Sequence, residues 1–152
     1  MEKKDVWLGE FEVGDFYVSD TYKVTEEEII EFAQKYDPQY FHTNPEQAKD
    51  SFFEGLASSG WMTAGITMKL QVESHPFGFD LVGIEVNLEW PSPTRAGDIL
   101  QIRTEVLDIK MSKSKPNQGI LEVETTTTNQ DGEVRMVMQN KILGFKRPEE
   151  KK

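Results

Sequence analysis

The chain of 152 residues contains no cysteine and only two histidines, His42 and His75. The absence of cysteine excludes disulfides, thiol nucleophiles and zinc sites built from cysteine. Two histidines are also too few for a metal centre that uses several of them. The sequence therefore predicts a protein without a metal site.

Basic charge and long apolar runs are scarce as well. Lysine and arginine number 17 against 27 acidic residues, which gives a net charge of −10. Clustered basic side chains bind nucleic acids and anionic membranes, so neither is expected as a partner. No apolar run reaches the ~18 residues that span a bilayer, and the charged residues 1–5 lead into no signal-peptide core. We expect a soluble, cytoplasmic protein.

Three motifs of common enzyme classes are also missing. The sequence has no Gly-x-Ser-x-Gly elbow, no Gly-Lys-Ser/Thr phosphate loop and no Gly-x-Gly-x-x-Gly fingerprint. Hydrolase triads, nucleotide hydrolysis and Rossmann redox chemistry are therefore disfavoured.

The first half of the chain carries helix signals after a short predicted strand at residues 16–24. Thr25 and Glu28 form a capping-box pair, and a helical apolar stripe follows and ends before Pro38, so Asp37 lies at the C-terminal edge of that helix. An Asn-Pro pair at residues 44 and 45 predicts a second short helix over residues 45–51.

The rest of the chain predicts a buried helix followed by a sheet. Residues 60–72 are apolar nearly all round, which is typical of a helix surrounded by protein, and Trp61, Met62 and Met68 are expected to fill the core. Short links rich in turn residues separate later stretches of β-forming residues, which favours an antiparallel meander. The expected architecture is α+β, an antiparallel sheet wrapped around a long central helix. Its strands are predicted at 82–90, 98–111, 119–129 and 133–146, and the tail 147–152 is expected to fray.

The candidate site is a short segment in which His42 follows Asp37 by five residues. A carboxylate and an imidazole on one rigid loop can converge on a single water, one accepting a proton while the other donates one. By itself this spacing is more typical of an Asp that ends a helix and a His that packs against aromatic rings. Pro38 restricts the loop, and neighbouring aromatic residues could keep water out: Tyr36, Tyr40 and Phe41.

Several spaced motifs together resemble the MaoC-like dehydratases, the family that includes the (R)-specific enoyl-CoA hydratases. The segments Trp90–Asp98 and Ser112–Pro116 resemble that family's Pro-Gly-Asp and Ser-Arg-Ser-Arg-Pro motifs. The resemblance covers about residues 10–147 and implies one hotdog domain over residues 1–152. The positions that match the family's main signature are Phe32, Ala33, Asp37, His42, Phe53, Gly55 and Gly60.

The resemblance implies reversible addition of water to a trans-2-enoyl thioester of coenzyme A. Asp37 and His42 would hold the catalytic water, and the amide of Gly60, at a helix N-terminus, would stabilise the enolate oxygen. Coenzyme A would enter as part of the substrate, with no other cofactor, and the protein would act as a homodimer. Substrate-binding roles are expected for Gln39, Ser59, Arg95, Lys113 and Lys115, with Lys110 adding to a basic patch.

Two alternatives remain open at this stage. One is an acyl-CoA thioesterase on the same fold, which the Asp37 and His42 pair disfavours. The other is a module that binds acyl-CoA without turnover. Gln39 stands where the family usually has Asn, and Pro38 comes two positions before the family's proline, which favours that module. His75, just before Pro76, is expected to be a loop histidine.

Overall fold

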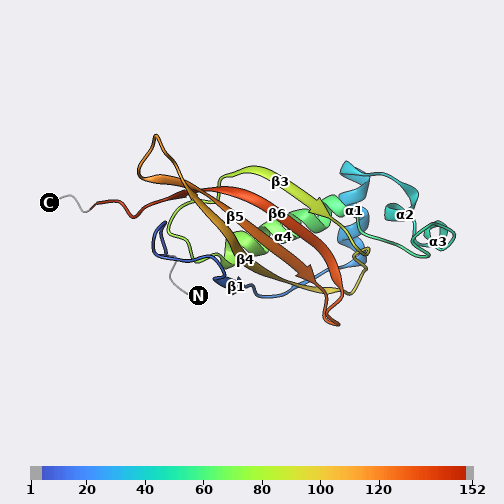
Figure 1. Cartoon of the computed structure of the whole chain (residues 1–152). Coiled ribbons are helices and arrows are strands. Elements are labelled where there is room, and N and C mark those ends of the chain that lie inside the picture. The colour runs from blue at the N-terminus through green and yellow to red at the C-terminus, as the bar shows by residue number, and fades with distance from the viewer. Residues whose placement is uncertain (1–4, 150–152) are drawn as a thin grey trace.

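The computed structural model describes residues 5–149 and confirms the predicted α+β architecture. A long helix, α4 (Gly60–Ser74), lies against one face of a six-stranded antiparallel sheet (Figure 1). The strands are β1 (Phe16–Val18), β2 (Tyr22–Lys23), β3 (Gly83–Glu89), β4 (Ile99–Met111), β5 (Gln118–Thr128) and β6 (Val134–Phe145).

The strand order is β1-β4-β5-β6-β3, and β2 also pairs with β4. The predicted four-stranded meander is therefore wrong for β3, which lies beyond β6 instead of beside β4. The connection after β3 contains Pro91 and Pro93 and cannot form a tight hairpin. It runs past the start of α4 instead, where the carbonyl of Thr94 accepts from the amide of Ser58 at 2.8 Å. This crossing brings the loop between β3 and β4 to the N-terminus of α4.

The predicted strand at residues 16–24 is two short strands along one edge of β4. Val18 is opposite Arg103 and Tyr22 is opposite Leu100, so the register slips by one residue between them. Between the two strands, the hydroxyl of Ser19 accepts from the amide of Ile102 on β4 at 3.0 Å and donates to the carbonyl of Asp20 at 2.6 Å, so a side chain takes the place of a main-chain acceptor there.

The predicted first helix is confirmed as α1 (Glu26–Tyr36), with Thr25 accepting from the amide of Glu28 and Asp37 as its C-terminal cap. A single helical turn, α2 (Tyr40–Thr43), was not predicted, because one turn is too short to show an apolar period. The second predicted helix is α3 (Pro45–Ala48), which begins as expected after the capping residue Asn44 but ends earlier. α1 borders the N-terminal part of α4, where Ile29 belongs to the same buried cluster as Met62 and Ile66. α2 and α3 lie beyond the N-terminal end of α4 (Figure 1).

One face of α4 is buried, and it carries an apolar row beside a polar row. Met62 belongs to the apolar row and is buried, as predicted. In the polar row, Thr67 meets Thr127 on β5 at 2.7 Å between hydroxyl oxygens. The side-chain amide of Gln71 also donates to the hydroxyl of Thr125 on β5, at 3.2 Å. These two hydrogen bonds give partners to polar groups that are costly to bury, and they fix the helix on the sheet. The apolar row is Met62, Ile66 and Leu70, and the polar row is Thr63, Thr67 and Gln71.

The opposite face of α4 is open to solvent. Trp61 is 62% exposed and Met68 is 42% exposed, so the prediction that both fill the core is wrong for a single chain. The sheet covers only one side of the helix. On the other side Trp61 packs edge-on against Trp90, with ring centres 5.6 Å apart, and still stays largely exposed. Val72 is also exposed on α4.

The C-terminal tail is held at its first residue. Arg147 donates to the carboxylates of Glu10 and Asp5 at 2.8 Å and 3.0 Å, so the prediction of fraying is wrong for Arg147. The last part of that prediction, residues 150–152, lies outside the described residues. Across residues 5–149, no helix is long and apolar enough to cross a membrane.

Candidate active site

The structure brings Asp37 and His42 together. Asp37 caps α1, with its amide bonded to the carbonyl of Ala33 at 2.8 Å, and His42 lies on the turn α2. The Nε2 atom of His42 is 3.4 Å from Oδ2 of Asp37. The His42 side chain is buried, whereas that of Asp37 is 18% exposed. The pair is therefore accessible from one side, through the carboxylate.

The ring of His42 is fixed in one orientation. Its Nδ1 lies 2.5 Å from the carbonyl of Ala57, and a carbonyl can only accept, so Nδ1 carries the hydrogen. Phe41 packs edge-on against the imidazole with ring centres 4.6 Å apart. Nε2 is left to face Asp37 and is the nitrogen that can exchange a proton.

Two neutral donors hold the carboxylate of Asp37. The amide group of Gln39 donates to Oδ1 and the hydroxyl of Ser59 donates to Oδ2, both at 2.7 Å. Desolvation raises the pKa of Asp37, but the bonds from Gln39 and Ser59, together with His42, outweigh it and hold the pKa below its ordinary value. Asp37 is therefore ionised at neutral pH and can accept a proton.

Gly60 lies beside this pair as the first residue of α4. The amide of a first helical residue has no acceptor within its own helix, and the helix dipole adds positive potential there. The indole N–H of Trp90 donates to the carbonyl of Gly60 at 3.0 Å. A Cβ atom at position 60 would lie 2.6 Å from the Trp90 ring. Glycine is thus required for the indole to pack over the start of α4.

A pocket of about 320 Å³ opens in front of Asp37 and His42. Its walls are mainly aromatic rings and prolines, and the start of α4 forms one side. Such a pocket can exclude bulk water from a bound acyl group while leaving the carboxylate in reach. The lining includes Phe52, Phe53, Gly60, Trp61, Thr63, Trp90, Pro91 and Pro93. A larger cleft of about 650 Å³ lies elsewhere, between β1 and the C-terminal end of α4.

Arg95 was expected to bind substrate, but its guanidinium bonds to the main chain. It donates to the carbonyls of Leu56 and Phe53 at 3.1 Å and 2.5 Å. These bonds fix the segment whose next carbonyl, that of Ala57, orients His42. Arg95 therefore supports the geometry of the imidazole, a contact that the sequence motif alone did not indicate.

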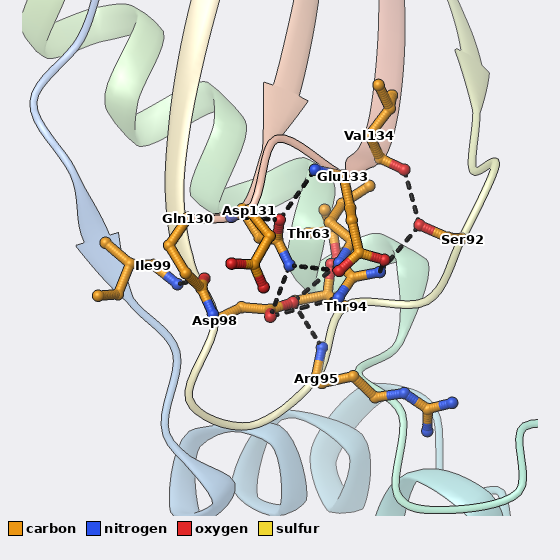
Figure 2. Close-up of polar contacts among 12 residues, drawn as sticks. Thr63, Ser92, Thr94, Arg95, Asp98, Ile99, Gln130, Asp131, Glu133 and Val134 are labelled. Carbon is orange, nitrogen blue, oxygen red and sulfur yellow. Dashed lines mark hydrogen bonds and ion pairs between the residues drawn. The ribbon is translucent and has the colours of Figure 1, made fainter.

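The main chain of Arg95 belongs to a buried cluster around Asp98 (Figure 2). The amide of Arg95 donates to Oδ2 of Asp98 at 2.9 Å, while its guanidinium points away from the cluster (Figure 2). Arg135 forms an ion pair with Asp98 at 2.9 Å, and both side chains are buried. Asn129 adds a bond to Oδ1 at 3.2 Å. The cluster joins the loop after β3 to the turn between β5 and β6.

The remaining predicted residues lie away from the pocket. Lys113 and Lys115 belong to the hairpin between β4 and β5, at the opposite end of the sheet from α1, α2 and α3 (Figure 1), and Lys110 lies on the strand before it. His75 caps the far end of α4, is buried and stacks on Phe77. One chain therefore assembles Asp37, His42, Gln39, Ser59 and Gly60 but not the lysines.

The helix wrapped by an antiparallel sheet, with an acid and an imidazole at the helix N-terminus, defines a protein of the hotdog fold. The family model of the MaoC like domain matches residues 12–130. The chain belongs to the MaoC-like family, as the sequence resemblance implied.

Individual relatives agree with this assignment. The chain is 36% identical over 126 residues to the uncharacterized protein YdeM of Bacillus subtilis strain 168, a match that covers 81% of this chain and 87% of that protein. Its structure is similar to that of a MaoC-like dehydratase from Rhodospirillum rubrum, with a TM-score of 0.93 and 43% identity over 95% of this chain and 99% of that one. The R-hydratase PhaJ1 of Pseudomonas aeruginosa shares the fold, with a TM-score of 0.75 and 20% identity over 97% and 93% of the two chains.

Proposed function

We propose that the protein is a hydro-lyase that reversibly adds water to a trans-2-enoyl thioester of coenzyme A. The observation that carries the proposal is the Asp37 and His42 pair, 3.4 Å apart, facing an apolar pocket beside the start of α4. The reaction is redox-neutral, so it needs no cofactor beyond the coenzyme A of the substrate itself.

In the proposed mechanism, one water bonds to Oδ2 of Asp37 and Nε2 of His42. The ionised carboxylate of Asp37 takes a proton from that water, and the oxygen of the water bonds to C3 of the enoyl group. The electrons of the double bond move toward the thioester carbonyl and form an enolate. The pair then returns one proton to C2, so atoms and charge balance over the cycle. Dehydration follows the same path in reverse.

The proposed donor to the enolate oxygen is the amide of Gly60. An amide at a helix N-terminus is already oriented, so it stabilises developing charge without further reorganisation. The aromatic pocket walls would strengthen this interaction by lowering the local dielectric. The relevant walls include Phe53 and Trp90.

We further propose a homodimer. Within residues 5–149, β3 pairs with β6 alone and ends the order of the sheet, which leaves an open edge. Ile84 and Val86 on β3 are exposed, as are Trp61 and Met68 on α4. A second copy would cover these apolar surfaces near the pocket. Sedimentation at micromolar concentration should show twice the 17.5 kDa of one chain, and a monomer alone would exclude the dimer.

For Lys113 and Lys115 to bind the phosphates of coenzyme A, they would have to belong to the second copy and not to the chain that supplies Asp37. Within one chain, the length of β4 separates the hairpin from Asp37. The cytoplasmic location also stays a prediction from the sequence.

The function is tested by following crotonyl-CoA in two assays with the same protein. Loss of the enoyl-thioester absorbance reports hydration, and release of free thiol reports hydrolysis. We expect hydration without thiol release. Thiol release would support the thioesterase, and binding without either signal would support the non-catalytic module.

A further inference from the structure

Ser59 lies between Asp37 and the helix N-terminus and is completely buried. It is the N-terminal cap of α4, and its hydroxyl oxygen accepts from the amide of Trp61 at 3.3 Å. The same hydroxyl donates to Oδ2 of Asp37 at 2.7 Å. Its neighbours Ser58 and Gly60 line the pocket, whereas Ser59 stands behind the carboxylate. This position does not suit the substrate contact expected from the sequence.

The direction of these two bonds is set by chemistry. The amide of Trp61 can only donate, so the Ser59 oxygen must accept from it. The one hydroxyl hydrogen is then free for Asp37, and an ionised Oδ2 accepts it more strongly than a protonated Oδ2 would. A proton on Oδ2 would compete with that bond. The arrangement therefore favours the ionised carboxylate and fixes the oxygen that also faces His42.

We infer that Ser59 is a positioning residue that ties the carboxylate of Asp37 to the N-terminus of α4. Through this hydroxyl, the amide and dipole of the helix act on Asp37 as well as on the pocket. The role deepens the proposed hydratase function and rests on it for its catalytic meaning. The link between Ser59 and the ionisation of Asp37 can be measured without turnover.

The test must separate this role from ordinary helix capping. Ser59→Gly removes the hydroxyl, and glycine is well tolerated at a helix cap. Ser59→Thr keeps a hydroxyl in the same place and serves as the rescue variant. Thr25→Gly is the matched control, because Thr25 caps α1 through the amide of Glu28 and does not bond to Asp37.

The first readout is the titration of the Asp37 carboxyl group, followed by its ¹³C chemical shift in each purified variant. The pKa of Asp37 should rise in Ser59→Gly, return toward the wild-type value in Ser59→Thr and stay unchanged in Thr25→Gly. His42 is the ionisable group that faces Asp37, so the same spectra should follow its ring. An unchanged Asp37 titration in folded Ser59→Gly would overturn the inference.

The second readout is kinetic. Ser59→Gly should lower kcat by about tenfold, since misplaced catalytic groups lose part of their orientation advantage, while KM changes little. The acid limb of the pH profile should move to higher pH. Loss of kcat in Thr25→Gly to the same extent would assign the effect to capping and contradict the inference. If no variant hydrates crotonyl-CoA, the proposed function fails, but the titration still decides the role of Ser59.

Discussion

Two aspartates of the same fold, Asp37 and Asp98, lie in opposite kinds of environment. Asp98 is 4% exposed and bonds to Arg135, Asn129 and the amide of Arg95. Asp37 accepts one hydrogen bond on each oxygen from a neutral donor. It also faces the imidazole of His42 and borders a pocket. The carboxylate of Asp98 is buried against the permanent positive charge of Arg135, whereas that of Asp37 is open to a pocket on one side.

The difference separates a structural acid from a reactive one. A carboxylate paired with arginine keeps its charge because the guanidinium does not lose its proton, so it anchors a loop. A carboxylate paired with histidine faces a ring nitrogen that can take up or release a proton. The two regions are also connected, because Arg95 bonds to Asp98 through its amide and to the segment before Ala57 through its guanidinium.

The largest expected effect comes from breaking the reactive pair. Asp37→Asn and His42→Ala should each lower kcat for hydration by roughly 10²-fold or more, because general acid–base groups typically contribute 10²–10⁴-fold. Both variants should stay folded by circular dichroism. Asp108→Asn is the matched control, since it removes the same charge from an exposed site on β4. Near wild-type turnover in either site variant would remove the mechanism.

The same substitution at the enclosed aspartate should act on stability instead. Asp98→Asn removes the buried carboxylate that pairs with Arg135 at 2.9 Å and leaves the guanidinium with the more distant carboxylate of Glu133, at 3.8 Å. Breaking a buried ion pair typically costs about 3–5 kcal/mol of unfolding free energy. Urea denaturation would measure the loss. The exposed pair of Arg103 and Glu105, at 3.2 Å, is the comparison, and Glu105→Gln should cost no more than about 1 kcal/mol. Equal losses in the two variants would show that burial of Asp98 is energetically unimportant.

Acid should weaken the contribution of Asp37 to stability. Its pKa is held below the ordinary value of 3.8, so the ionised group stabilises the fold above its unfolded pKa, and this part is lost as pH falls through the folded pKa. The stability difference between wild type and Asp37→Asn should therefore shrink between neutral pH and pH values below 3.8. A stability difference between wild type and Asp37→Asn that stays constant or grows in acid would contradict a lowered pKa of Asp37.

The smallest effect is expected far from both aspartates. Replacing Lys113 and Lys115 with alanine should raise KM for acyl-CoA less than about tenfold at low salt and leave kcat unchanged, the pattern of lost uniform binding. Added salt should reduce the difference, because exposed charges are screened beyond about 8 Å at physiological ionic strength. An unchanged KM at low salt would mean that the phosphates bind elsewhere.

The elements with strong local signals were predictable from sequence. The α1 cap at Thr25 follows from the capping-box spacing, and the structure confirms it. The pair of Asp37 and His42 was singled out by the family resemblance of several spaced motifs and not by its own spacing, and the structure brings the two side chains together. The position of β3 was not predictable, because strand order depends on packing of distant segments. The buried Ser59 and the half-buried Arg95 were assigned to substrate because sequence does not show where a polar side chain points. The cap position of Ser59, just before an apolar helix at Gly60, was the available signal.

The central claim is most directly tested by a structure of the Asp37→Asn variant with crotonyl-CoA bound. The account predicts that the thioester oxygen lies within hydrogen-bond distance of the Gly60 amide and that C3 faces residue 37 and His42. A thioester bound in the cleft between β1 and the C-terminal end of α4, or turned away from Gly60, would contradict it.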